Sequence, residues 1–163
     1  MENELYSNTK YSFERNESKI IVINVPITSS TVHTFDVTLS ELITIDKHSD
    51  VLLDSITTYN CNTSNGSENN MGFILTINEF EVKSVSNTSS IGRSIFIPNE
   101  QTTSTAADLD TSKTHKGKKL NYICSINPTN INRLSGKITN INGDSIFVSG
   151  TGRFVAEFVI TSK

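Results

Sequence analysis

The sequence lacks tryptophan entirely and holds only three prolines, two methionines and two cysteines in 163 residues. Strong helix formers are also scarce, since alanine occurs three times and glutamine once. No apolar run approaches the roughly 20 residues that a membrane-spanning helix needs. The polar, mixed-charge N-terminus does not read as a signal peptide, so we expect an intracellular protein. These absences disfavour a helical protein, a membrane helix and a secreted disulfide scaffold.

Uncharged polar residues dominate instead: serine, threonine and asparagine together number about 60. Charged residues make up 19% of the chain, and the net charge is −3. This balance does not favour binding to a polyanion, so we expect no nucleic-acid partner. The length suits one domain with a single sizeable core.

Apolar and polar residues alternate with the period of a half-buried β-strand in many places. In the stretch 33–39, for example, Phe35, Val37 and Leu39 share one face. Turn residues separate nine stretches of β character, at 19–27, 33–39, 50–60, 71–85, 92–98, 120–126, 131–141, 145–149 and 153–163. Pro26 ends the first stretch or places it at a sheet edge.

This pattern predicts an all-β fold, an antiparallel β-sandwich that forms a single jelly roll of about eight strands. The last strand, ending just before the C-terminus, is expected to be central in its sheet. Residues 1–18 are predicted to form a polar N-terminal arm, and residues 19–163 the jelly-roll domain. Short helices are conceivable only at 38–45 and 106–110.

No catalytic or metal-binding constellation stands out. The three histidines lie far apart, and Lys113 and Lys119 stand where a calcium loop at 108–119 would need glycine and a carboxylate. Glu79 and Glu81 would share a strand face and, with Glu157 and Asp54, are the carboxylates available for acid–base work. We expect no enzyme, no metal and no cofactor. The cysteines, at positions 61 and 124, are expected to be free thiols.

The polar stretch 99–119 has no apolar period and is interpreted as a surface loop that makes contacts. It carries the one basic cluster of the chain, formed by Lys113, Lys116, Lys118 and Lys119. A solvated loop face accounts for the cluster, and docking against an acidic partner protein is the functional alternative. In the N-terminal arm, Tyr6, Tyr11 and Phe13 are the aromatic side chains suited to anchor a partner contact.

Five stretches together resemble small capsid proteins of large nucleocytoplasmic icosahedral DNA viruses. They are LSELITIDKHSDVLLDSITTYN (39–60), FILTINEFEV (73–82), IFIPNE (95–100), LNYICSINPTNINRLSGKITN (120–140) and GRFVAEFVI (152–160). The resemblance implies a single jelly-roll penton or minor capsid protein of the virion, made in the host cytoplasm. It also implies a homo-oligomer, with a pentamer favoured, that meets other capsid proteins and does not span a membrane.

Two other functions stay open at this point. A β-sandwich could serve as a carbohydrate- or receptor-binding module, although the absence of tryptophan removes the usual stacking surface for a sugar. An enzyme on a β scaffold would need a pocket with convergent polar groups near Glu79 or Glu157.

Overall fold

The computed structural model describes residues 17–28, 33–61, 71–87, 92–99, 112–115, 121–147 and 152–163. Within these ranges every regular element is a β-strand. The nine strands are β1 Ser18–Pro26, β2 Thr34–Ile45, β3 Ser49–Tyr59, β4 Gly72–Ile77, β5 Ile95–Pro98, β6 Ser112–His115, β7 Asn121–Ile126, β8 Thr129–Asn140 and β9 Arg153–Ser162.

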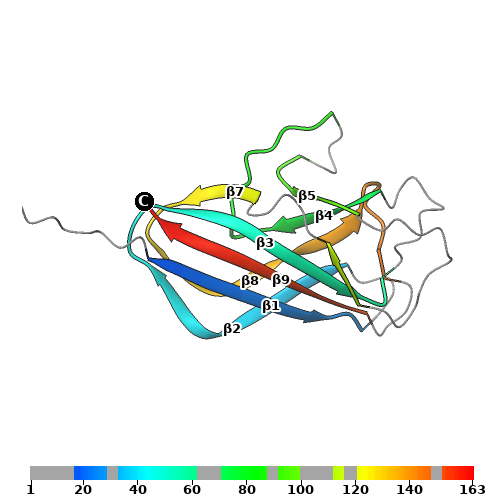
Figure 1. Ribbon diagram of the computed structural model, residues 1–163, viewed down its shortest axis with the longest axis horizontal. Coiled ribbons are helices and arrows are strands. Elements are labelled where there is room, and N and C mark those ends of the chain that lie inside the picture. Colours follow the sequence, from blue (N-terminus) through cyan, green and yellow to red (C-terminus); the bar gives the residue numbers. More distant parts are fainter. Residues whose placement is uncertain are drawn as a thin grey trace, which may run out of the picture.

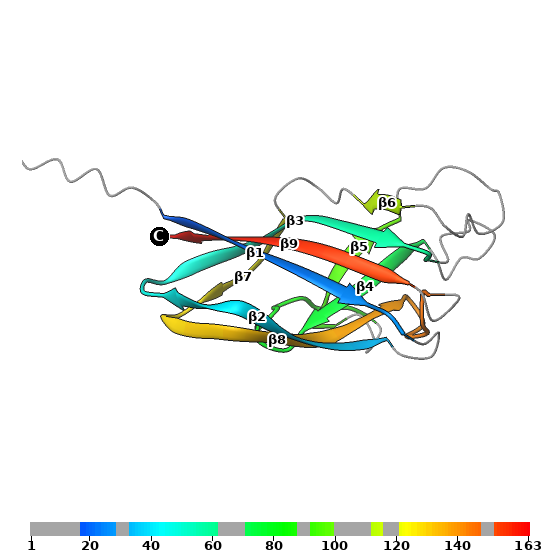
Figure 2. The ribbon, with the colours of Figure 1, turned by 90° about the horizontal axis from the view of Figure 1, so that it is seen from below.

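The strands form two antiparallel sheets that face each other (Figures 1 and 2). One sheet has the order β1-β9-β3, with β6 and β7 both beside β3, and the other has the order β2-β8-β4-β5. Because β6 pairs with the end of β3 and β7 with its beginning, the two short strands share one position, and nine strands fill eight positions. Counted along the chain, the first of these eight positions (β1) pairs with the last (β9), and the second (β2) pairs with the seventh (β8). The third (β3) pairs with the sixth (β6 and β7), and the fourth (β4) pairs with the fifth (β5). This is the strand order of a single jelly roll, as predicted.

Inward-facing residues of both sheets form the core between them. The apolar faces expected from the alternation are confirmed: Phe35 in β2, Phe73 in β4 and Phe154 and Phe158 in β9 are all buried. Two aromatic contacts pack edge to face, Phe35 with Phe154 at 5.3 Å and Phe80 with Phe158 at 5.5 Å between ring centroids. Since the partners come from different sheets or from the turn after β4, these contacts join the two layers.

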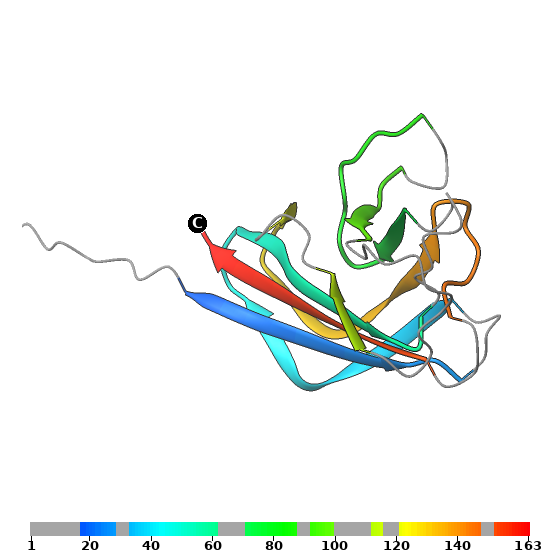
Figure 3. The same cartoon turned by 45° about the vertical axis from the view of Figure 1, so that its right-hand side comes forward.

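The positions of β1 and β9 in the sheet also agree with the prediction. Figure 3 shows β1 in blue, β9 in red and β3 side by side, with β9 in the middle. Strand β1 lies at the sheet edge and ends at Pro26. Proline has no N–H to donate to a neighbouring strand. It is tolerated here because no described strand lies on the open side of β1 to need that donor.

Several predicted boundaries were wrong. Residues 38–45 are not helical but continue β2, which is irregular between Thr38 and Ile43, where its pairing with β8 shifts register. The stretch 71–85 yields strand only to Ile77, because Phe80 turns back into the core. The stretch 145–149 contributes only a bridge from Phe147 to Cys61 among the described residues. The other helical candidate, 106–110, lies outside the described residues.

Candidate interaction surface

A row of apolar side chains crosses the outer face of the sheet that contains β1. Ile20 in β1 pairs with Val159 in β9, Val159 pairs with Leu52 in β3, and Leu52 pairs with Tyr122 in β7. Directly opposed residues of antiparallel strands point to the same face, and the inward neighbours of these residues are buried. We call these four residues the apolar row. With strands about 4.8 Å apart, it spans roughly 14 Å across four strands.

Both ends of the apolar row are open to solvent. Ile20 is 58% exposed and Tyr122 is 61% exposed, while the two residues between them are half-buried. Val22, two residues along β1 on the same face, is 54% exposed. An apolar row of this kind adds nothing to the core of its own sandwich, and clustered exposed apolar residues commonly mark contact sites.

Polar groups lie beside the apolar row, on the side toward the first residues of β3. The Lys163 ammonium lies 2.8 Å from Asp50 Oδ1, and the Ser125 hydroxyl donates to the same oxygen at 2.6 Å. The Tyr122 hydroxyl lies 2.9 Å from Ser125 Oγ, so the row and its polar border are directly connected. The hydrogen bonds from Lys163 and then Ser125 lower the pKa of Asp50 below its ordinary value.

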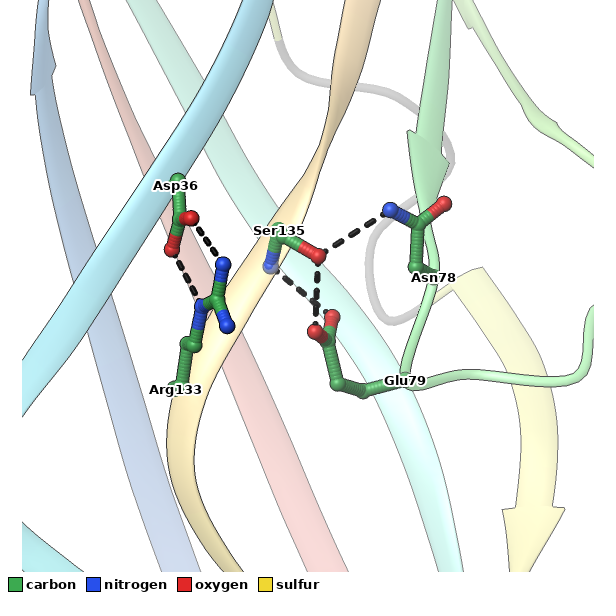
Figure 4. Close-up of polar contacts among 5 residues, drawn as sticks. All are labelled: Asp36, Asn78, Glu79, Arg133 and Ser135. Carbon is green, nitrogen blue, oxygen red and sulfur yellow. Dashed lines mark hydrogen bonds and ion pairs between the residues drawn. The ribbon is translucent and has the colours of Figure 1, made fainter.

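The outer face of the other sheet is polar and internally paired (Figure 4). The Arg133 guanidinium in β8 donates through Nε and Nη2 to the Asp36 carboxylate in β2. Ser135 gives its N–H and its hydroxyl to the two oxygens of Glu79, at 2.9 and 2.8 Å, and accepts from the Asn78 amide at 3.0 Å. The hydrogen bond from Arg133 lowers the pKa of Asp36. We call this side of the sandwich the charged outer face, and it also carries two exposed apolar residues, Leu42 at 59% and Phe96 at 45%.

An open cleft of about 820 Å³ lies between the segment around β5 and strand β7. Phe96, Tyr122 and His48 are among the residues that line it. Tyr122 thus belongs both to the apolar row and to this cleft. Burial raises the pKa of the Cys124 thiol, also at this cleft, to about 11, with smaller contributions from Asp50 and Glu81.

The carboxylates singled out for acid–base work do not form one cluster, since Glu79 and Glu157 lie against different sheets. Asp54 lies in the irregular part of β3, next to Ser55, which pairs with Glu157. Glu79 lies in the turn after β4 and not on a strand, and both of its oxygens bond to Ser135 on the charged outer face. It lines a shallow hollow of about 390 Å³ with Arg133. Glu157 lies on β9, opposite Val22, and therefore on the same outer face as the apolar row. The described residues contain no cluster of three histidine, cysteine, aspartate or glutamate side chains suited to a metal ion.

The expected contact residues are only partly placed. Lys113 belongs to β6, a short strand that interrupts the segment expected to be a loop, and it pairs with Thr58 of β3. The other three lysines of the basic cluster and the three aromatic residues of the N-terminal arm lie outside the described residues. Cys61 and Cys124 are both buried, and neither forms a disulfide, which agrees with the expected thiols. No helix in the described part of the chain is long and apolar enough to cross a membrane.

Comparisons with known proteins leave the family open. No protein-family model matches the chain, and no curated protein matches it. Among solved structures, it is similar to a chain of the T13 IBDV viral particle, with 11% identity and a TM-score of 0.28. The alignment covers 89% of this chain and 31% of the length of that chain. The strand order, and not this likeness, identifies the jelly roll.

The apolar row was missed by reading the sequence one strand at a time. Its local signal is that the alternation fails at each of its four residues, where apolar or aromatic residues stand next to each other on both faces. Those places are Ile20–Ile21, Leu52–Leu53, Tyr122–Ile123 and Phe158–Val159. Such doublets are read as fully buried strand segments until the sheet shows that one side has no cover.

Proposed function

We propose that this chain is a structural subunit of a viral capsid, a penton or minor capsid protein of the virion that has no catalytic role. The observation that supports this most is the single jelly-roll strand order combined with an apolar row on one outer face. Jelly rolls recur in viral capsid and lectin domains. A capsid subunit has to bury part of its surface against neighbours, whereas an isolated sandwich gains nothing from exposed apolar side chains.

The pairing of the charged groups on the second sheet is consistent with the same role. On the charged outer face, Asp36 pairs with Arg133 and Glu79 bonds to Ser135, so these groups have partners within the chain. On the other face, the apolar row has an exposed residue at each end. We propose that the apolar row docks on a neighbouring subunit, and that the charged outer face stays in water. The arm residues Tyr6, Tyr11 and Phe13 and the basic cluster are further proposed contacts.

The test is the mass of the purified full chain by size exclusion with light scattering, over a concentration series. The wild type is compared with Val159→Lys, which puts a charge in the middle of the apolar row. Val155→Lys is the matched control, because Val155 is also a half-buried valine on the same face of β9 but lies outside the row.

A discrete pentamer that Val159→Lys dissociates and Val155→Lys leaves intact would support a vertex subunit. A trimer that binds a glycan as the isolated domain would favour the carbohydrate- or receptor-binding alternative. Equal assembly of all three proteins would contradict docking through the apolar row. A wild type that stays a monomer at every concentration would argue against a self-sufficient ring and shift the proposal to a minor capsid protein ordered by its neighbours.

A further inference from the structure

Strand β1 leaves one backbone edge unpaired among the described residues. It pairs with β9 along its whole length, from Ser18 opposite Thr161 to Pro26 opposite Arg153, without a register shift. No described strand lies on its other side. In Figure 2 this edge faces the viewer, above β2 of the second sheet. An open edge of this length offers hydrogen-bonding groups to another strand.

Two hydrogen bonds fix which backbone groups point to the open edge. The Ile27 N–H donates to the Gly152 carbonyl at 2.7 Å, and the Ser162 N–H donates to the Glu17 carbonyl at 3.1 Å. In an antiparallel ladder, successive residues direct their N–H and C=O alternately toward one neighbour and the other. The odd-numbered residues of β1 therefore bond to β9. The N–H and C=O groups of four even-numbered residues point outward: Ser18, Ile20, Val22 and Asn24.

Within the described part of the chain, two devices that commonly protect an edge strand, proline and lysine, leave this stretch open. Pro26, whose missing N–H would also point outward, stands at the end of β1 and beyond the four outward-pointing residues. Lys19 is turned to the second sheet, where its ammonium donates to the Thr44 carbonyl in β2 and lies 4.0 Å from Asp46.

We infer that β1 pairs antiparallel with β1 of a second copy of this chain, around a two-fold axis at Ile21. In this register Ser18 faces Asn24 of the second copy, and Ile20 faces Val22. The pairing uses all four outward-pointing residues of each copy, and each facing pair exchanges two hydrogen bonds. Shifting the register by two residues in one direction sets Ser18 against Pro26, which cannot donate. A shift in the other direction leaves Asn24 without a partner in β1.

The side chains fit the same register. Ile20 and Val22 are 58% and 54% exposed on the outer face, and in the pair each covers the other of the second copy. Apolar residues directly opposite each other are a favourable cross-strand arrangement. The contact is isologous, since the same surface serves on both copies. The pairing does not require the capsid role, and it shares Ile20 with the apolar row. In a capsid subunit it would add a contact through the backbone edge of β1 to the contact through the outer face of the sheet.

Cysteine pairs test the register in the full-length protein. Hydrogen-bonded antiparallel residues have Cα atoms about 5.5 Å apart, within the range that a disulfide accepts. A mixture of Ile20→Cys and Val22→Cys proteins should therefore give several-fold more covalent dimer under mild oxidation than either variant alone. Each variant alone places its cysteines on a diagonal of roughly 7–8 Å, which is too far. Val155→Cys is the control from the same face, and the wild type reports on the buried native thiols.

A second variant keeps the test independent of the cysteines. Val22→Pro removes an outward N–H that the β1–β9 ladder does not use, and Pro26 shows that β1 accepts proline in this orientation. Because the lost bond occurs twice in a two-fold pair, we expect the dissociation constant by sedimentation to rise about tenfold or more.

Two outcomes overturn the inference: a mixture that gives no more dimer than the single variants, or an unchanged dissociation constant for a folded Val22→Pro protein. A pentamer whose cysteine mixture does not cross-link would overturn the edge pairing and leave the proposed capsid function standing. A dimer that cross-links as expected but tolerates Val159→Lys would support the edge pairing and contradict docking through the apolar row.

Discussion

Replacing Gly136 by alanine should destabilise the fold strongly, because β8 passes too close to its neighbours at this position to accept a side chain. Gly136 is buried between Phe35 of β2 and Ile77 of β4, which are its partners on either side. An added Cβ would overlap the Thr76 carbonyl oxygen and would lie 2.9 Å from the carbonyl carbon and 3.0 Å from Phe35 Cζ. Two of these three atoms are backbone, so a side-chain rotation cannot relieve the overlap.

The cost follows from what has to move. Forcing one extra methyl group into a well-packed interior typically costs about 1–3 kcal/mol, and more where the backbone has to shift. For a domain of this size, each kcal/mol lowers the melting temperature by roughly 2–4 °C. We therefore expect Gly136→Ala to lower the free energy of unfolding by at least about 2 kcal/mol.

Two other glycines provide matched controls for the same substitution. Gly92 has no heavy atom within 4 Å of an added Cβ and no positive φ, so Gly92→Ala should change stability by less than about 1 kcal/mol. Gly143 has equally open surroundings but a φ of +93°. Gly143→Ala should cost roughly 1–2 kcal/mol through the backbone alone.

Urea unfolding of the three variants and the wild type, followed by circular dichroism, gives the order of stability. The midpoint for Gly136→Ala should be the lowest, with an unchanged dependence of the free energy on urea. If Gly136→Ala were as stable as Gly92→Ala, the close passage of β8 past β4 would be refuted, and with it the packing of the second sheet described above.

Three further predictions concern the polar border, the thiols and the core. Lys163 lowers the pKa of Asp50, so the pair stabilises the fold above the ordinary value of 3.8 and loses its effect as the pH falls through the lowered pKa. The stability difference between wild type and Asp50→Asn, measured by urea unfolding, should therefore shrink toward zero below pH 3.8. The buried Cys124 thiol, with a pKa of about 11, should react with a thiol reagent at pH 8 only after urea unfolding; fast native labelling would contradict its burial. Phe158→Ala should cost about 3–5 kcal/mol in the same unfolding assay, since the ring is fully buried and packs on Phe80.

Local patterns in the sequence determined the fold class and much of the core. The two-residue period places Phe154, Ala156, Phe158 and Ile160 on one face wherever β9 lies, and the structure buries all four. Pro26 indicated a strand end or a sheet edge, because the physical reason, a missing N–H, acts at that residue alone, and β1 shows both. The ends of strands were less predictable. Strand β2 continues through residues 38–45, a helical candidate in the sequence, because its pairing with β8 resumes after a register shift. Strand β4 ends before Phe80, which packs into a core formed by distant segments.

The candidate interaction surface was decided only by the tertiary structure. Ile20, Leu52, Tyr122 and Val159 are spread over most of the chain, and they meet because β9 inserts between β1 and β3. Alternation along one strand shows that its two faces differ. It does not show which strands are neighbours or which face is covered. Those properties depend on pairing between residues far apart in sequence. The sequence by itself therefore determined a β-sandwich with a well-defined core, and the order of its strands decided where that sandwich presents an apolar row and an open edge.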